Sequence, residues 1–247
     1  MNTQEILNFE LEKFKRSQKK IDFSKLTKEN TSIALSKALI DALSQAGRRL
    51  KIDYKSVRDD LLKDFIDYYL KFASDKKNIV INDFNKDFNN LISKFINKMT
   101  ELKKEEFAAF GFAQKFISMS FKYMYCFDDS KRGNFKFCKL PLDKYTISWY
   151  RQNGDKELIK QFKKLKFAWS GISKQLYNDI QNDIDSILRK TCLYQIKCHD
   201  KTAIIILPEN KLEVEFIVWS QEKLNVVYNE ILKYEDYFER LGIKKIN

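Results

Sequence analysis

The sequence predicts a mainly α-helical protein, in which a helical body is followed by a small C-terminal β-meander and a closing helix. Two observations support this fold class. Apolar residues recur at helical spacing through residues 3–190, whereas three short runs after Cys192 are rich in β-forming residues. Hydrophobic residues make up 44% of the 247 residues, which is enough for a sizeable core. We therefore divide the chain into a helical domain, residues 1–190, and a C-terminal unit, residues 191–247.

Long amphipathic segments build the first half of the helical domain. Residues 31–50 begin at Thr31, a favourable N-cap residue, and Gly47 is placed to end the helix. Residues 54–75 and 82–104 carry large apolar side chains at helical spacing. We interpret these apolar stripes as core rather than as a binding surface.

A further helix is expected over residues 113–127. It follows a turn at Gly111, and the turn follows a shorter helical stretch over residues 103–110. A helix, a glycine-containing turn and a second helix make a helix-hairpin-helix, whose exposed backbone N–H groups can hold a DNA phosphate. Lys115 and Lys122 are two turns apart and therefore lie on one side of the second helix.

Pro141 and Asp143 mark the start of the next helix. Proline is poorly tolerated inside a helix, and aspartate is a favoured N-cap residue. Backbone N–H groups and the helix dipole would favour the ionised carboxylate at that position. These residues allow two interpretations: Asp143 is only a cap and Lys115 only a solvated lysine, or the two side chains form a site.

The C-terminal unit contains three β-rich runs, at residues 192–198, 202–207 and 212–219. The third run alternates Leu, Val, Phe and Val with glutamates, which is typical of a half-buried strand. A turn is expected at residues 208–211, because a proline and an asparagine lie there. A final helix is predicted over residues 220–242.

The charge of the chain indicates a polyanionic partner. Its 46 Lys and Arg residues against 34 Asp and Glu residues give a formal charge of +12, which favours nucleic acid over a basic surface that serves solubility alone. No apolar run approaches the roughly 18 residues of a membrane span. The N-terminal residues lack a signal-peptide core. We therefore expect a cytoplasmic protein that does not enter membranes.

The cysteines predict neither a disulfide framework nor a metal site. Four cysteines in a chain of this length are too few for a disulfide scaffold. His199 follows Cys198 directly, but no close Cys-x-x-Cys pair accompanies them. We expect reduced, buried thiols and no metal or other cofactor.

Residues of about 105–150 resemble the helix-hairpin-helix DNA glycosylases, and most closely their archaeal 8-oxoguanine glycosylase branch. In that family a catalytic lysine lies at the start of the hairpin's second helix, and Lys115 in "GFAQKFISMSFK" matches it. A catalytic aspartate opens the next helix after a proline and one further residue, and Asp143 in "LPLD" matches it. Ala113 replaces the second glycine of the family's hairpin, and the insert "DDSKRGNFKFC" is unusually long.

The resemblance implies removal of a damaged or modified base that has been flipped out of the DNA duplex. Asp143 would stabilise the positive charge that develops on the sugar as the base leaves. Lys115, as the neutral amine, would attack C1′ and form a Schiff base, which also permits strand cleavage at the abasic site. Desolvation and the nearby Lys122 ammonium would favour the neutral amine. The excised base is oxidised guanine or another modified base, such as one in invading DNA.

The resemblance and the charge pattern also nominate the residues that bind DNA. The expected phosphate contacts are Gly111, Ala113, Lys122, Lys131, Arg132, Lys136 and Lys139. The aromatic residues that could stack on a flipped base are Phe112, Tyr123, Trp149 and Trp169.

Two other functions remain open at this point. The first is a non-catalytic nucleic-acid-binding module, which needs only the charge and the hairpin. The second is a protein-interaction factor, possibly in defence against foreign DNA, that uses a C-terminal strand as a docking edge. Convergence of Lys115 and Asp143 in one cleft favours the enzyme over both.

The first testable prediction concerns DNA binding. Affinity for duplex DNA should fall by at least about tenfold between low and physiological salt, because phosphate contacts release counterions. Fluorescence anisotropy of a labelled duplex at several salt concentrations measures this slope. An affinity that does not change with salt would contradict the electrostatic argument.

Overall fold

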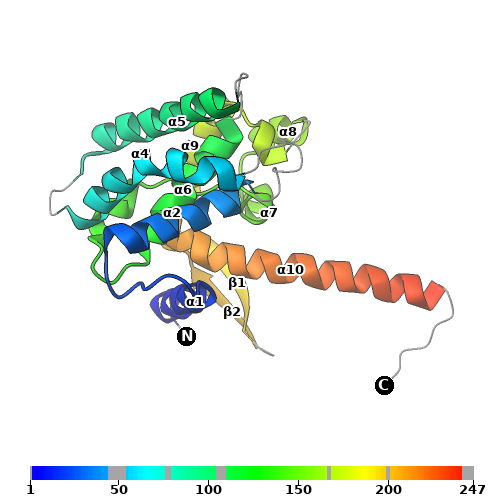
Figure 1. Ribbon diagram of the computed structural model, residues 1–247. Coiled ribbons are helices and arrows are strands. Elements are labelled where there is room, and N and C mark those ends of the chain that lie inside the picture. Colours follow the sequence, from blue (N-terminus) through cyan, green and yellow to red (C-terminus); the bar gives the residue numbers. More distant parts are fainter. Residues whose placement is uncertain are drawn as a thin grey trace.

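The computed structural model describes residues 2–43, 54–75, 79–103, 110–165, 168–198 and 201–240. It confirms the predicted fold class: the protein is mainly helical, with a two-stranded antiparallel sheet near the C-terminus and a final helix (Figure 1). The α-helices are α1 (Thr3–Ser17), α2 (Lys28–Leu43), α4 (Tyr54–Ser74), α5 (Ile81–Lys103), α6 (Phe110–Tyr125), α7 (Lys144–Asn153), α8 (Lys156–Lys163), α9 (Lys174–Arg189) and α10 (Lys211–Arg240). The remaining elements are the 3₁₀-helices η1 (Arg132–Phe137) and η2 (Ala168–Gly171) and the strands β1 (Leu193–Cys198) and β2 (Lys201–Ile206).

Helix α6 lies at the centre of the helical body. Every residue from Gly111 to Tyr125 is buried, and α6 contacts α2, α4 and α5 as well as η1 and η2. Large aromatic side chains fill the space around it: Phe116 packs edge-to-face on Phe65, and Phe121 packs on Phe72 in the same way. Such pairs bury a large apolar area for few residues. The side chains of α6 therefore point into the core on all sides.

Gly111 lies inside the first turn of α6, and not in a turn before the helix as predicted. A Cβ atom at this position would come within 2.4 Å of the Trp169 carbonyl oxygen and within 2.7 Å of the Ser170 backbone. The glycine is therefore explained by the close approach of η2 to α6. The helical stretch expected before it, residues 103–110, lies largely outside the described residues, as does the predicted helix end at Gly47.

The N-terminal boundary of α2 also differs from the prediction. Helix α2 begins at Lys28, and Thr31 is a buried residue within it rather than its N-cap. The Thr27 side chain accepts a hydrogen bond from the backbone N–H of Asn30 at 3.2 Å, and its carbonyl accepts one from the N–H of Thr31. The capping interaction predicted for Thr31 is therefore made one turn earlier, by Thr27.

The C-terminal sheet has two strands, and the predicted third strand is wrong. β1 and β2 pair antiparallel, with Leu193 opposite Ile206 and Cys198 opposite Lys201. Residues 212–219, the expected third strand, form the first turns of α10, so that the predicted final helix begins at Lys211.

The alternation in residues 212–219 was misleading because this part of α10 is buried on nearly all sides. Its apolar side chains and Glu215 pack between α7 and α1, so that helical periodicity cannot be distinguished from strand alternation over so short a run. The Asn210 side chain accepts a hydrogen bond from the N–H of Leu212 at 3.0 Å, which supports the start of the helix. The second half of α10 extends away from the body in Figure 1.

No helix within the described ranges is both long and apolar enough to cross a membrane.

Leucines at two positions of α10 test its packing. Leu212 is fully buried, whereas Leu224 is 54% exposed. We expect Leu212→Ala to lower the free energy of unfolding by about 2–5 kcal/mol, because it removes buried apolar area and leaves a cavity. Leu224→Ala is the matched control and should change it by less than about 0.5 kcal/mol. Urea denaturation measures the free energy of unfolding of both variants. Equal losses in the two variants would contradict the burial of the first turn of α10.

Candidate active site

Asp143 caps α7, as the sequence predicts. Its Oδ1 accepts hydrogen bonds from the backbone N–H groups of Tyr145 at 2.9 Å and Thr146 at 3.1 Å. The Thr146 hydroxyl in turn accepts from the Asp143 N–H at 2.9 Å and donates to the Pro141 carbonyl at 2.7 Å. This reciprocal capping fixes the carboxylate at the positive end of the helix dipole.

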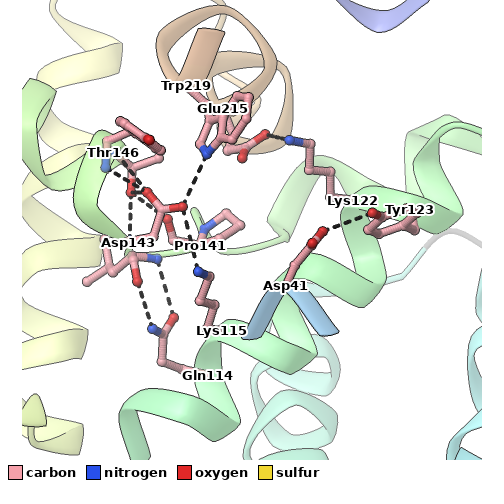
Figure 2. Close-up of polar contacts among 12 residues, drawn as sticks. Asp41, Gln114, Lys115, Lys122, Tyr123, Pro141, Asp143, Thr146, Glu215 and Trp219 are labelled. Carbon is pink, nitrogen blue, oxygen red and sulfur yellow. Dashed lines mark hydrogen bonds and ion pairs between the residues drawn. The ribbon is translucent and has the colours of Figure 1, made fainter. Parts of the chain in front are cut away.

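The second carboxylate oxygen of Asp143 faces two other helices. Its Oδ2 accepts a hydrogen bond from Trp219 Nε1 of α10 at 3.2 Å and lies 3.9 Å from Lys115 Nζ of α6 (Figure 2). Lys115 and Asp143 are 5% and 7% exposed, so the pair is largely screened from solvent. The structure therefore brings the two predicted catalytic residues together.

Two glutamine side chains hold the backbone before Asp143 against α6 and α9. Gln114, the neighbour of Lys115, donates from its amide to the Leu142 carbonyl at 3.2 Å and accepts from the Leu142 N–H at 3.4 Å. Gln181 of α9 makes the same pair of contacts with Leu140, at 2.8 Å and 3.1 Å. The hydrogen bonds of these two carboxamides fix the backbone before Asp143, which sets the position of the Asp143 carboxylate relative to Lys115.

Lys115 and Asp143 line a cavity of about 370 Å³, within the range of about 300–1,000 Å³ for small-molecule sites. Its walls come from α1, α2, α6, α7 and α10. The other lining residues are Glu10, Lys13, Phe14, Ser17, Gln18, Asp41, Met119, Lys122, Tyr145, Phe216, Trp219, Ser220 and Lys223.

Lys122 faces the same cavity, but the structure does not present it as a surface cation for DNA. It is 2% exposed and forms an ion pair with the buried Glu215 of α10 (Figure 2). The rings of Phe14 and Phe216 lie 4.4 Å and 4.7 Å from its Nζ, a cation–π arrangement. Burial raises the pKa of Glu215, and the Lys122 ammonium opposes that rise. Glu215 thus provides a buried counter-charge for Lys122, which reduces the repulsion of Lys115 expected from the sequence.

The other predicted phosphate contacts are divided between core and surface. Gly111 and Ala113 are buried in α6, so neither side chain position is at the surface. Lys131, Arg132 and Lys136 are exposed in and beside η1.

Lys139 is half-buried and differs from its three exposed neighbours in the insert. Burial, and then the nearby Lys211 ammonium, lower the pKa of Lys139 to about 8. Lys139 is therefore only partly charged above that pH, so its contribution to any phosphate contact would decline in alkaline solution.

The predicted base-stacking residues do not form the cavity wall. Trp169 stacks over the Lys115 ammonium at 4.6 Å, and Phe112 packs edge-to-face on Trp169 at 5.3 Å. Trp149 is fully buried, and Tyr123 is 1% exposed with its hydroxyl bonded to Asp41 at 2.9 Å.

The aromatic side chains that do line the cavity are Phe14, Tyr145, Phe216 and Trp219. Sequence reasoning missed Phe14 and Trp219 because α1 and α10 are remote from the hairpin motif. Tyr145 packs edge-to-face on Trp219 at 5.3 Å, and this pair forms the wall beside Asp143.

The cavity carries no metal-ligand set. Within the described residues, no three His, Cys, Asp or Glu side chains are grouped to hold a metal ion, and His199 lies outside them. Cys126, Cys138 and Cys192 are free and buried, as expected for reduced thiols. Lys115 and Asp143 place an amine next to a carboxylate in a cavity with aromatic walls.

Comparison of the chain with family models, curated proteins and solved structures finds no match.

The Lys122–Glu215 pair provides a stability test. Glu215→Gln removes the counter-charge of a buried ammonium, and we expect it to lower the free energy of unfolding by about 3–5 kcal/mol. In Lys122→Met/Glu215→Leu both charges are replaced by apolar side chains, and the double variant should be as stable as the unchanged protein or more stable. Guanidinium denaturation measures both; an equal loss in both variants would mean that packing, rather than charge pairing, is responsible.

Proposed function

We propose that the protein is a DNA glycosylase with AP-lyase activity, which flips an oxidised or otherwise modified base out of duplex DNA and excises it. The observation that carries the proposal is the pairing of Lys115 with Asp143 at 3.9 Å in the wall of one cavity. The resemblance of residues around these two to glycosylase motifs gives the pairing its chemical interpretation. The formal charge of +12 suits a DNA partner.

In the first step the flipped nucleotide places its C1′ between the amine and the carboxylate. Lys115 gives up its ammonium proton and donates the freed electron pair to C1′, and the bond from C1′ to the base breaks with its electron pair leaving on the base. The departing base takes up the proton that Lys115 released. Positive charge develops on the sugar as this bond breaks, and the Asp143 carboxylate stabilises it electrostatically.

In the second step the bond from C1′ to the ring oxygen breaks, a proton passes from the nitrogen to that oxygen, and the nitrogen–carbon bond becomes a Schiff base. Loss of a proton from C2′ then expels the 3′ phosphate with its bonding electrons, which cleaves the strand. Water hydrolyses the remaining imine and returns Lys115 as an amine. The low solvent exposure of the lysine and aspartate protects these intermediates from premature hydrolysis.

Asp143 is suited to the electrostatic task because its position does not depend on the substrate. Capping of α7 and the Trp219 indole hold both of its oxygens before DNA binds. A carboxylate that is fixed in advance stabilises developing charge without the cost of reorganisation during the reaction.

The alternative is a non-catalytic nucleic-acid-binding or protein-interaction factor, possibly in defence against foreign DNA. The exposed Lys131, Arg132 and Lys136 near η1 favour nucleic-acid binding in either case. In such a factor, the ion pair of Lys115 and Asp143 would have only a structural role.

Substitution of the two residues tests the catalytic proposal. Lys115→Gln should retain DNA binding and lose the covalent complex that borohydride traps on modified or abasic duplexes. Asp143→Asn should fold, because asparagine also caps helices, and should excise the base about 10²–10³-fold more slowly. Rates are measured by gel separation of cleaved duplexes.

The control is Lys160→Gln, which removes an exposed lysine of α8 that does not line the cavity. It should react like the unchanged protein. Base excision that survives both Lys115→Gln and Asp143→Asn would overturn the catalytic roles given to these two residues, and failure of the unchanged protein to excise any modified base would leave the binding factor.

A further inference from the structure

Two of the three carboxylates that line the cavity have an ion-pair partner. Asp143 faces Lys115 at 3.9 Å, and Glu10 pairs with Lys13 at 3.1 Å. These two groups therefore already face a cation. The third carboxylate, on α2, has no such partner within the described part of the chain.

This third carboxylate is Asp41, in the last turn of α2. The Tyr123 hydroxyl donates to its Oδ2 at 2.9 Å, and Figure 2 shows the side chain pointing from α2 toward the space between Lys115 and Lys122. Among the described residues, the structure gives no hydrogen-bond donor to the other oxygen, Oδ1. Tyr123 thus fixes the orientation of the carboxylate and leaves one acceptor directed at the cavity.

The surroundings of Asp41 make that acceptor unusual. Burial raises the pKa of Asp41, while the Tyr123 hydroxyl and the Lys122 and Lys115 ammonium groups oppose the rise. Asp41 is only half-buried, and a ligand that brings an N–H group to this oxygen takes the place of water there. The aromatic side chains Phe14 and Trp219 line the same cavity and provide surfaces on which a flat ring can lie.

We propose that Asp41 is a specificity-determining residue, which accepts a hydrogen bond from an exocyclic amino group on the base held in this cavity. The inference rests on the proposed glycosylase function and adds the class of base. The cavity should prefer a base with an exocyclic amino group over a base that has a keto oxygen or a hydrogen atom at the same position. A carboxylate accepts a hydrogen bond from an amino group. A keto oxygen at the same position is itself an acceptor, so it would form no hydrogen bond with the carboxylate.

The preference should be large because the discriminating contact involves a charged group. A site built to hydrogen-bond a substrate N–H rejects the analogue that lacks it, since the acceptor of the site is then left without a donor. For a hydrogen bond to a charged group, the expected preference is about 10- to 100-fold in kcat/KM.

The test uses duplexes in which the modified base differs only in the amino group. One pair carries oxidised guanine or oxidised hypoxanthine, and a second carries a 5-modified cytosine or the corresponding uracil. Each excision rate is divided by the rate of borohydride trapping on an abasic duplex, which contains no base for Asp41 to contact. The unchanged protein should prefer the amino member of at least one pair, and Asp41→Asn should reduce that preference to within about twofold.

Glu10→Gln is the matched control, because it alters a cavity carboxylate that is already paired with Lys13. It should keep the preference of the unchanged protein. Asp41 is excluded as the specificity residue if Asp41→Asn keeps the preference, if Glu10→Gln loses it equally, or if the unchanged protein excises no amino member of either pair. Absence of trapping on the abasic duplex would instead reject the proposed function itself, together with this inference.

Discussion

Burial of α6 on every side is the constraint on which the rest of the structure depends. Its residues from Gly111 to Tyr125 are all buried, although they include two lysines and a glutamine. A buried charge or amide is costly unless a partner satisfies it. The partners come from the segment around Leu142 and Asp143 and from Glu215 in α10. The fold of the C-terminal half is therefore arranged around the polar side chains of one helix, and the cavity lies where those side chains meet.

Much of the fold and the central pair could be predicted because each has a local signal. Helical spacing of apolar residues reveals α4 and α5. The strands β1 and β2 are rich in β-branched and aromatic residues. Asp143 follows a proline closely and begins a helix, which is a capping signal that depends only on neighbouring residues. Lys115 lies near the start of the preceding helix. Their meeting at 3.9 Å agrees with the motif spacing.

The rest of the site could not be predicted, because its residues meet only through tertiary packing. Trp219 reaches Asp143 across 76 positions of sequence, and Tyr123 reaches Asp41 across 82. The strand expected at residues 212–219 was wrong for a related reason, since a run that is buried on nearly all sides loses the polar face that reveals helical periodicity. Lys122 carried a charge that suggested DNA contact, but its buried partner Glu215 gave no signal of its own in the sequence.

The most direct test of the central claim is to locate the covalent bond between protein and DNA. After borohydride reduction of the protein with a duplex that contains an abasic site, proteolysis and mass spectrometry identify the modified lysine. The account predicts that the sugar remnant is attached to the Nζ of Lys115, because that amine lies in the cavity beside the Asp143 carboxylate. Attachment to another lysine, or no adduct at all under conditions in which the duplex is bound, would contradict it.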